Sequence, residues 1–375
     1  MKKFKVLHLS THLNLGGITS YLLVAAAALK KRGHEMAVAA GTSEAAVDFE
    51  RLGVRAHRFG IRTKSEFHPK LLLALPGLAR LVKRERFDVL HAHTRVTQVL
   101  AKLAGALCGV PVVSTAHGFY SPRFGRRLFD AWGERVIAVS PLVAEELMKT
   151  HHVDFRRICV IPNAVDVVSL EARLAGRDRA ADRTGLGIPA DAFVLTSISR
   201  LVRDKGHEYL IEAAALLAKE MPRLHLVILG DGREKKDLEA LVRARGLEGR
   251  AHLVPAVRDI TGVLAVTDIF AHPATFREGF GLSIAEAMVA RKPVIATDIW
   301  AINTLLENGR QAVLVPPKSA SALAEAVRGL AARPDETRAM VERAYIFSRG
   351  ISSLDRMGEA LENVYAEVVR KGADA

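Results

Sequence analysis

The sequence predicts an α/β protein built from two Rossmann-like domains in tandem, and three observations favour this fold class. The chain has 375 residues, which exceeds the usual size of one domain. Its residues are 49% hydrophobic and 25% charged, a composition typical of folded globular proteins. Short apolar runs alternate with helical patterns along the chain, as expected for parallel strands joined by crossover helices.

The first half of the chain contains six of these short apolar runs. They predict strands at Lys5–Leu9, Glu35–Ala40, Val54–Phe59, Val89–Ala92, Val112–Thr115 and Arg135–Val139. Helical patterns separate the runs, for example at Thr19–Arg32 and Leu142–Thr150. This order of elements predicts one parallel sheet with helices on its faces.

The same alternation returns in the second half. Apolar runs predict strands at Val194–Ile198, Leu224–Leu229, Ala251–Leu253, Ile269–His272 and Val294–Ala296. The helical patterns between them include His207–Lys219, Lys235–Arg245 and Leu282–Ala290. A charged, Ala- and Gly-rich stretch between Pro162 and Phe193 separates the two series of strands. We therefore predict a first domain over residues 1–165, a second over 166–345, and a helical segment over 346–375.

The formal charge of +13 is confined to the first half. Residues 1–165 hold 25 Lys and Arg against 12 Asp and Glu, whereas residues 166–375 hold 29 of each kind. Such asymmetry indicates that one domain faces an anionic partner, which could be nucleic acid, membrane phospholipid or a phosphorylated substrate. A basic surface that only favours solubility is the alternative.

Several classes of protein are disfavoured by what the sequence lacks. Two cysteines, Cys108 and Cys159, cannot form a disulfide framework and suit a reducing compartment. No uninterrupted apolar segment reaches the roughly 18 residues that a membrane span requires. The apolar run after Lys5 is too short for a signal peptide. We expect a cytoplasmic protein that could associate peripherally with the inner face of the membrane.

Paired glycines follow the first predicted strand. Gly16 and Gly17 lie where the chain turns from that strand into a helix. Glycines let the backbone approach a ligand closely, and free amides at a helix N-terminus suit a phosphate group. The pattern is not G-x-G-x-x-G, so no dinucleotide is implied, and a tight turn without a ligand fits equally well.

Charged residues follow two predicted strands of the second half. Arg200 and Lys205 come after the strand at 194–198, and such a pair suits a diphosphate, although solvated surface cations are the commoner case. Glu278 and Glu286 flank a glycine-containing turn and the start of a helix. Carboxylates accept hydrogen bonds from sugar hydroxyls, and the amides of Phe280, Gly281 and Leu282 could hold phosphate oxygens.

Taken together, these motifs resemble those of the family 4 retaining glycosyltransferases. The resemblance covers nearly the whole chain, and its motifs occur in the family's order. They are Gly16-Gly17, Thr115-Ala-His117-Gly118, Pro162-Asn163-Ala-Val-Asp166, Arg200…Lys205-Gly206, Gly230-Asp-Gly232 and the E-x7-E segment from Glu278 to Glu286. The resemblance implies the GT-B fold, in which two Rossmann-like domains with parallel sheets face a cleft and a C-terminal helix crosses back to the first domain.

The resemblance also implies roles for single residues. Glu278 is similar to the family glutamate that contacts the donor sugar, and Glu286 to the one that binds the ribose. Arg200 and Lys205 are similar to the pair that neutralises the diphosphate leaving group. His117 matches the family histidine beside the reacting sugar. The remaining predicted donor-binding residues are Gly16, Gly17, Arg258, Phe280, Gly281 and Leu282.

The leading hypothesis is therefore a retaining, metal-independent glycosyltransferase that uses a nucleotide-sugar donor and needs no cofactor. Its acceptor would be a lipid-linked sugar or polysaccharide of cell-envelope glycan synthesis. Two alternatives stay open: a nucleotide-sugar epimerase of similar fold and a catalytically silent binding protein. Nucleic acid is not expected as a partner, because no recognised binding motif accompanies the charge.

Two features depart from the simplest form of this hypothesis. His91 and His93 are spaced like a metal pair, but no further ligand is found in the sequence, and we predict no metal site. Relatives commonly show Gly-Gly-x-x-Glu where this chain has Trp300, Ala301 and Thr304. That change is expected to affect specificity more than reaction type.

Two segments of the first half combine apolar and basic residues. The segment 70–86 has an apolar stripe and a basic face, which suits either an anionic membrane surface or a core helix with a solvated side. The segment 119–129 interleaves aromatic residues and arginines just after His117, on the expected acceptor side. An anionic membrane surface is therefore a possible partner of the first domain.

Overall fold

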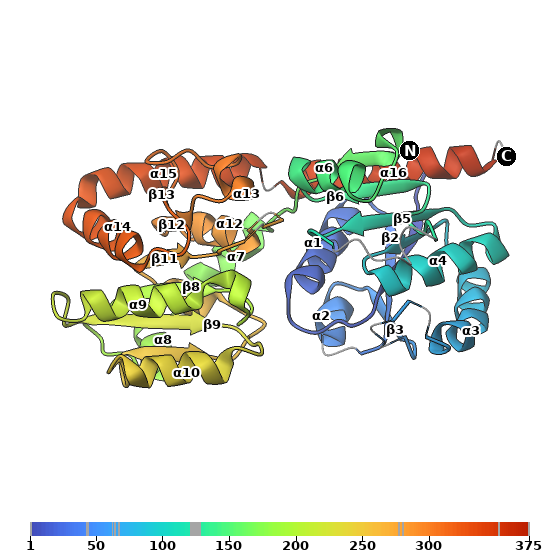
Figure 1. Ribbon diagram of the computed structural model, residues 1–375. Helices are drawn as coiled ribbons and strands as arrows, with labels where there is room; N and C mark the ends of the chain where they lie inside the picture. Colours follow the sequence, from blue (N-terminus) through green and yellow to red (C-terminus); the bar gives the residue numbers. More distant parts are fainter. Residues whose placement is uncertain are drawn as a thin grey trace. The chain divides into compact units, whose positions relative to one another are not determined.

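The computed structural model describes residues 2–42, 45–61, 63, 65–66, 68–120, 129–276, 278–279, 281–351 and 353–373. The chain divides into two compact units. Unit 1 comprises residues 1–164 together with 353–375, and unit 2 comprises residues 165–352. Each unit contains one parallel sheet with helices packed on it, so the predicted fold class is confirmed (Figure 1).

Unit 1 holds a seven-stranded parallel sheet with the order β3-β2-β1-β4-β5-β6-β7. Its strands are β1 Lys5–Ser10, β2 Glu35–Ala40, β3 Arg55–Arg58, β4 Val89–Ala92, β5 Val112–Ala116, β6 Arg135–Ala138 and β7 Ile158–Val160. Its described helices are α1 Gly17–Lys31, α2 Ala46–Arg51, α3 Lys70–Glu85, α4 Arg95–Cys108, α6 Pro141–Lys149, the short 3-10 helix Phe155–Arg157 and α16 Leu354–Ala373.

Unit 2 holds a six-stranded parallel sheet with the order β10-β9-β8-β11-β12-β13. Its strands are β8 Phe193–Ile198, β9 Leu224–Leu229, β10 Ala251–Val254, β11 Ile269–His272, β12 Val294–Thr297 and β13 Val313–Val315. Its described helices are α7 Val167–Ala175, α8 Arg179–Gly185, the 3-10 turn Arg203–Lys205, α9 His207–Leu217, α10 Lys235–Ala244, α11 Thr261–Val266, α12 Leu282–Val289, α13 Trp300–Asn303, α14 Ala320–Ala332 and α15 Pro334–Ile351.

Burial on both faces explains why the strands read as continuous apolar runs. Along β1, Val6 packs in the cluster that includes α1 and α16, while Leu7 and Leu9 pack on the other face with residues of α3 and α4. Parallel sheets covered on both sides show this pattern. Strands β7 and β13 were not predicted, because each is a three-residue strand at a sheet edge and carries too little pattern.

The C-terminal helix α16 packs on unit 1, where it contacts α1. Asp355, Glu362 and Glu367 on this helix form ion pairs with Lys31, Arg32 and Arg135. The segment was expected to begin at residue 346, whereas α15 continues to Ile351 and belongs to unit 2. Because α16 brings acidic residues, unit 1 has a net charge of +11, with 28 Lys and Arg against 17 Asp and Glu.

Helix α3 is the basic amphipathic segment identified in the sequence. Leu71, Leu78, Leu81 and Val82 are buried, and the helix contacts α4. On its solvent side, Leu72 and Leu73 are 67% and 80% exposed. The helix therefore packs one apolar stripe into the core and exposes its opposite face to solvent. Among the described helices, none is long and apolar enough to cross a membrane.

Candidate active site

In both sheets the chain reverses its direction of winding at one point. In unit 2 this switch lies between β8 and β11, because β9 and β10 extend the sheet one way and β12 and β13 the other. In unit 1 it lies between β1 and β4. Ligands of open α/β sheets bind beyond the carboxyl ends of the strands at such switch points. The loops after these four strands are therefore where a site is expected.

At the switch point of unit 2, a lysine and a glutamate form an ion pair. Lys205 follows β8 and Glu278 follows β11, and the ammonium group contacts Oε1 of Glu278. His272, the last residue of β11, donates a hydrogen bond from Nε2 to the same oxygen at 3.1 Å. Glu278 is only 9% exposed. The fold thus joins two residues that lie 73 positions apart in the sequence.

Glu278 is held in its ionised form. Burial alone would raise the pKa of its carboxyl group, but the hydrogen bond from His272 and the charge of Lys205 outweigh that effect and hold the pKa well below its usual range. The carboxylate therefore stays charged throughout the neutral range. His272 was not among the predicted site residues, although its position at a strand end, six residues before Glu278, was visible in the sequence.

Glycines allow the loops at this edge to approach one another. Gly206 has φ +65°, and a Cβ atom there would lie 2.0 Å from the carbonyl oxygen of Pro273. At Gly230, which follows β9, a Cβ atom would lie 1.9 Å from the carbonyl oxygen of Ser199. No backbone oxygen can tolerate these distances. Close packing of the loops after β8, β9 and β11 therefore requires glycine and fixes the position of Lys205.

The turn into α12 also places predicted residues at this edge. Gly281 precedes the helix with φ +69°, and Leu282 is the first helical residue. No side chain caps the helix, so its first amides are available to a ligand. Phe280 lies outside the described residues. The departures Trp300 and Ala301 lie in α13 after β12, where Trp300 is 49% exposed and Ala301 is buried.

Glu286 lies one turn inside α12. It is half-buried, and burial raises the pKa of its carboxyl group to about 7, against the lowering effect of the Arg173 charge. No hydrogen bond to its carboxyl group is found among the described residues. When it is ionised, both oxygens of this carboxyl group can accept hydrogen bonds from ligand hydroxyls. When it is protonated, one of them carries an O–H group and acts as a donor.

We expect donor binding to depend on the ionisation of Glu286. From pH 8 to pH 6 the ionised fraction of a group with a pKa of about 7 falls roughly tenfold, so the KM for a nucleotide sugar should rise by up to about tenfold. The diphosphate of a nucleotide sugar does not titrate in this range, so it cannot produce the same effect. Steady-state kinetics of the wild type and Glu286→Gln test this. A Glu286→Gln protein with an unchanged pH profile would contradict the assignment.

Two predicted residues are not joined to this cluster. Arg200 follows β8 and is exposed, and no described carboxylate forms an ion pair with it. Arg258 is exposed in the loop between β10 and α11. Both lie on the carboxyl side of the unit 2 sheet, as Lys205 and Glu278 do, but among the described residues neither arginine forms an ion pair with Glu278.

The predicted residues of unit 1 lie after β1, at its switch point, and after β5, the strand next to β4. Gly16 and Gly17 are exposed after β1, and α1 begins without a side-chain cap. A Cβ atom at either glycine would meet nothing within 4 Å, so close packing does not explain these residues. His117 directly follows β5, and its ring contacts the Tyr21 ring edge-on at a centroid distance of 4.8 Å.

The structure corrects one premise about the histidines. The sequence offered no third ligand beside His91 and His93, but β1 is the neighbour of β4 and pairs His8 directly with His91. Nitrogen atoms of His8, His91 and His93 lie within 4.8 Å of one another, and all three residues are buried. The residue types alone would therefore permit a metal ion, and the geometry of their contacts has to decide.

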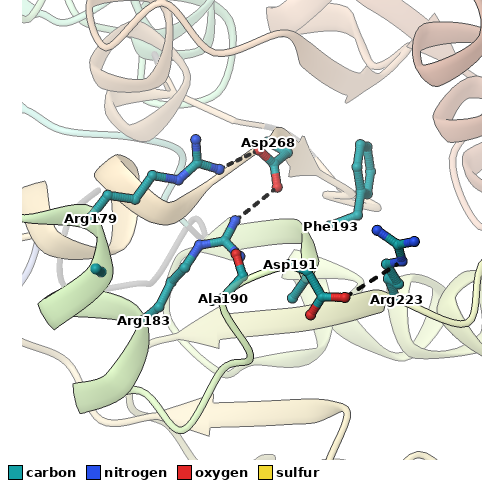
Figure 2. A pocket seen from close by; sticks show the side chains of 9 residues that line it. Arg179, Arg183, Ala190, Asp191, Phe193, Arg223 and Asp268 are labelled. Carbon is teal, nitrogen blue, oxygen red and sulfur yellow. Dashed lines mark hydrogen bonds and ion pairs between the residues drawn. The ribbon is translucent and has the colours of Figure 1, made fainter.

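A separate hollow lies at the amino ends of the strands of the unit 2 sheet (Figure 2). Phe193, which begins β8, and Asp268, which precedes β11, lie in its lining. Figure 2 shows Arg179 and Arg183 both directed at Asp268, while Arg223 faces Asp191. The hollow lies at the amino ends of the strands, whereas ligands of open α/β sheets bind at the carboxyl ends, so we do not assign the donor site there.

Comparison with known proteins agrees with the fold. Residues 178–347 match the family described as Glycosyl transferases group 1, and residues 15–168 match Glycosyltransferase Family 4. A D-inositol 3-phosphate glycosyltransferase of an Arthrobacter species is 28% identical to this chain. The match covers 94% of this chain and 90% of the relative. An Escherichia coli UDP-Gal:alpha-D-GlcNAc-diphosphoundecaprenol alpha-1,3-galactosyltransferase is 32% identical over 64% of this chain and 65% of its own.

Among solved structures, HepE of Anabaena in complex with UDP and glucose has a TM-score of 0.83 at 24% identity, covering 97% of this chain and 99% of that one. Fold and family matches define a glycosyltransferase built from two Rossmann-like units. The chain belongs to the family 4 glycosyltransferases, which have the GT-B fold.

Proposed function

We propose that the protein transfers a sugar from a nucleotide-sugar donor to a lipid-linked or polysaccharide acceptor, with retention at the anomeric carbon and without a metal ion. The observation that carries the proposal is the Lys205, His272 and Glu278 cluster at the switch point of unit 2. The Escherichia coli relative supports the choice of substrates, since its name gives UDP-Gal as donor and a diphosphoundecaprenol-linked sugar as acceptor. Cell-envelope glycan synthesis is the corresponding process.

The chemistry follows from where charge develops. The bond between the anomeric carbon and the β-phosphate oxygen breaks, and the acceptor hydroxyl forms its bond on the same face. Its proton passes to the departing diphosphate, so no general base is assigned. Arg200, Lys205 and the first amides of α12 would stabilise the negative leaving group. These two cations would supply the positive charge that a metal would otherwise bring.

Other residues would position the donor. Glu278, which is ionised, would accept hydrogen bonds from hydroxyls of the sugar, and Glu286 from the ribose. Arg258 and its loop would lie against the base. In unit 1, the open N-terminus of α1 at Gly17 would contact phosphate, and His117 would contact the reacting sugar.

A panel of UDP-, GDP- and ADP-sugars tests the proposal. Turnover should release a nucleoside diphosphate and depend on a glycan or glycolipid acceptor, and NMR of the product should show the anomeric configuration of the donor. EDTA should leave the rate unchanged. Sugar conversion without any acceptor would instead indicate an epimerase, and failure of every donor to bind or react would refute the proposal.

The solvent face of α3 is proposed to contact an anionic membrane. Arg80, Lys83 and Arg84 are exposed along it together with Leu72 and Leu73. Because each cation near an anionic surface contributes about 1 kcal/mol, Arg80→Gln/Lys83→Gln should weaken binding to phosphatidylglycerol vesicles by roughly 25-fold. Vesicle sedimentation of the full chain measures this.

The matched control for that pair is Lys236→Gln/Arg243→Gln on α10 of unit 2, which removes two exposed cations from the other unit. This control should bind as the wild type does. Equal binding to anionic and zwitterionic vesicles by the wild type would show that the excess charge of unit 1 has no membrane role.

A further inference from the structure

A continuous row of hydrogen bonds links His117 to the core of unit 1. Nε2 of His117 lies 2.9 Å from Nδ1 of His93, and Nε2 of His93 lies 2.8 Å from Nδ1 of His8. Nε2 of His8 lies 3.5 Å from the hydroxyl oxygen of Tyr365. The row thus begins at the half-buried His117 and reaches a fully buried tyrosine on α16.

The row continues past Tyr365. Its hydroxyl oxygen lies 2.8 Å from Nδ1 of His91, and Nε2 of His91 lies 2.7 Å from Oγ1 of Thr115. Residues from β1, β4, β5 and α16 therefore form one connected polar row inside an otherwise apolar face of the sheet. Such buried networks are stable only when each donor meets an acceptor.

The contacts of His93 with His8 and with His117 are in-line hydrogen bonds. The centroids of His8 and His93 are 5.1 Å apart, which is as far as two imidazole rings can be when their nitrogens are 2.8 Å apart. The same holds for His93 and His117, at 5.2 Å and 2.9 Å. Each nitrogen pair therefore shares one axis, with room between the atoms for a proton.

This geometry does not fit a metal ion. Two imidazole nitrogens each about 2.0–2.1 Å from zinc are more than 3 Å apart, and their lone pairs converge on the ion. Here the nitrogens of His8 and His93 point directly at each other, and both nitrogens of His91 already face Tyr365 and Thr115. No carboxylate of the described residues joins the group to balance a buried dication.

The histidines of the row are neutral. Burial lowers the pKa of His8 and of His117 to about 3, and it holds the pKa of His91 and His93 well below the usual range. A neutral imidazole has one N–H group and one lone pair. When one ring of an in-line pair donates, its neighbour must accept, so the protons of His117, His93 and His8 can only be ordered together.

Tyr365 decides the direction of that order. A phenol is a stronger donor than a neutral imidazole, so at 2.8 Å its proton lies toward Nδ1 of His91. The phenolic oxygen then keeps only lone pairs for Nε2 of His8. An N–H group at that position is satisfied, whereas a lone pair would face another lone pair. Nε2 of His8 therefore carries its proton, and Nδ1 of His8 accepts from His93.

We propose that Tyr365 is a positioning residue which, through His8 and His93, holds His117 in the tautomer with its proton on Nε2 and a free lone pair on Nδ1. This inference rests on the proposed function in so far as His117 contacts the donor sugar. A hydroxyl of that sugar would then donate a hydrogen bond to Nδ1 of His117. Removing one buried hydroxyl from the C-terminal helix would convert Nδ1 of His117 from an acceptor to a donor.

The first test measures the tautomers directly. Long-range 1H–15N correlation spectra of protein labelled with 15N-histidine should show His8, His91, His93 and His117 as neutral Nε2–H tautomers at pH 7.5. In Tyr365→Phe, Nε2–H of His8 would lose its acceptor, so His8, His93 and His117 should move together to the Nδ1–H form. Unchanged tautomers in Tyr365→Phe, or mixed tautomers in the wild type, would overturn the proposal.

Tyr21→Phe is the matched control. It removes the same atom from an equally buried tyrosine, whose hydroxyl lies 3.4 Å from Oγ1 of Thr115 at the far end of the row and forms no other hydrogen bond with the described residues. Its histidine tautomers should match those of the wild type. Addition of Zn²⁺ should leave all four signals unchanged, and stoichiometric shifts of the His8, His91 and His93 signals would show a metal site instead.

Kinetics of the same variants test the consequence for the donor. Tyr365→Phe should lower kcat/KM for the nucleotide sugar about fivefold or more, mainly through KM, while Tyr21→Phe stays within about twofold of the wild type. Equal rates for Tyr365→Phe and the wild type despite a changed tautomer would refute the link to His117. If no nucleotide sugar reacts at all, the proposed function fails while the spectra still decide the proton order.

Discussion

Glu278→Gln should reduce transfer by roughly 100- to 1000-fold while the protein stays folded, which is the scale of losing one preorganised electrostatic contact. The substitution keeps the size of the side chain and removes its charge. Lys205 and His272 then lose the carboxylate that both contact, so the cation is no longer held at the switch point. Initial rates with saturating donor and acceptor measure the effect.

Two comparisons make this result specific. Glu248→Gln, at an exposed position of the same unit, should leave the rate unchanged. If Lys205 and Glu278 act as one unit, the double variant Lys205→Gln/Glu278→Gln should be about as slow as the slower single variant. Strict additivity of the two losses would show that the residues act separately, and a wild-type rate for Glu278→Gln would remove it from the site.

A further expectation concerns how the stability of Glu278→Gln depends on pH. The pKa of Glu278 is held well below its unfolded value, so its contribution to stability is complete above that value and is lost only as the pH falls through the acid range. Between pH 6 and pH 9 the difference in free energy of unfolding between the wild type and Glu278→Gln should therefore be constant.

Gly206→Ala should lower the free energy of unfolding of unit 2 by roughly 3–5 kcal/mol. About 1–2 kcal/mol of this comes from the left-handed backbone, with φ +65°, that alanine would have to adopt. The rest comes from the new Cβ atom, which would lie 2.0 Å from the carbonyl oxygen of Pro273. The loops after β8 and β11 would be pushed apart, and Lys205 with them.

Gly246→Ala provides a close control, because Gly246 has φ +64° and a Cβ atom there meets nothing within 4 Å. It should lose only the backbone part, about 1–2 kcal/mol. Urea unfolding can be followed through Trp300, which lies in unit 2, in a Trp132→Phe background. Equal losses for the two variants would mean that the loops separate at little cost.

The sequence was sufficient to predict the order of most strands and both Rossmann-like units. Parallel strands buried on both faces are apolar along their length, so β1, β8 and β9 are evident without any tertiary information. Motifs confined to one loop, such as Gly16-Gly17 and the segment from Glu278 to Glu286, were likewise readable as ligand-binding candidates. Each of them depends only on residues near one another in the chain.

The contacts that depend on which strands are neighbours could not be predicted from the sequence. His8 joins His91 and His93 because β1 is the neighbour of β4, and Tyr365 joins them because α16 packs against that face. The distances along the chain, 85 residues from His8 to His93 and 274 from His91 to Tyr365, leave no local signal. The ion pair of Lys205 and Glu278 likewise follows from the adjacency of β8 and β11.

The charge shows the same division. Its total of +13, and its absence from residues 166–375, were fixed by composition. Only the fold placed Asp355, Glu362 and Glu367 against basic residues of the first unit, which lowers the excess of that unit to +11. Local pattern specifies elements because hydrophobic periodicity acts over a few residues. The sites depend on tertiary structure, because sheet topology brings distant side chains within hydrogen-bonding distance.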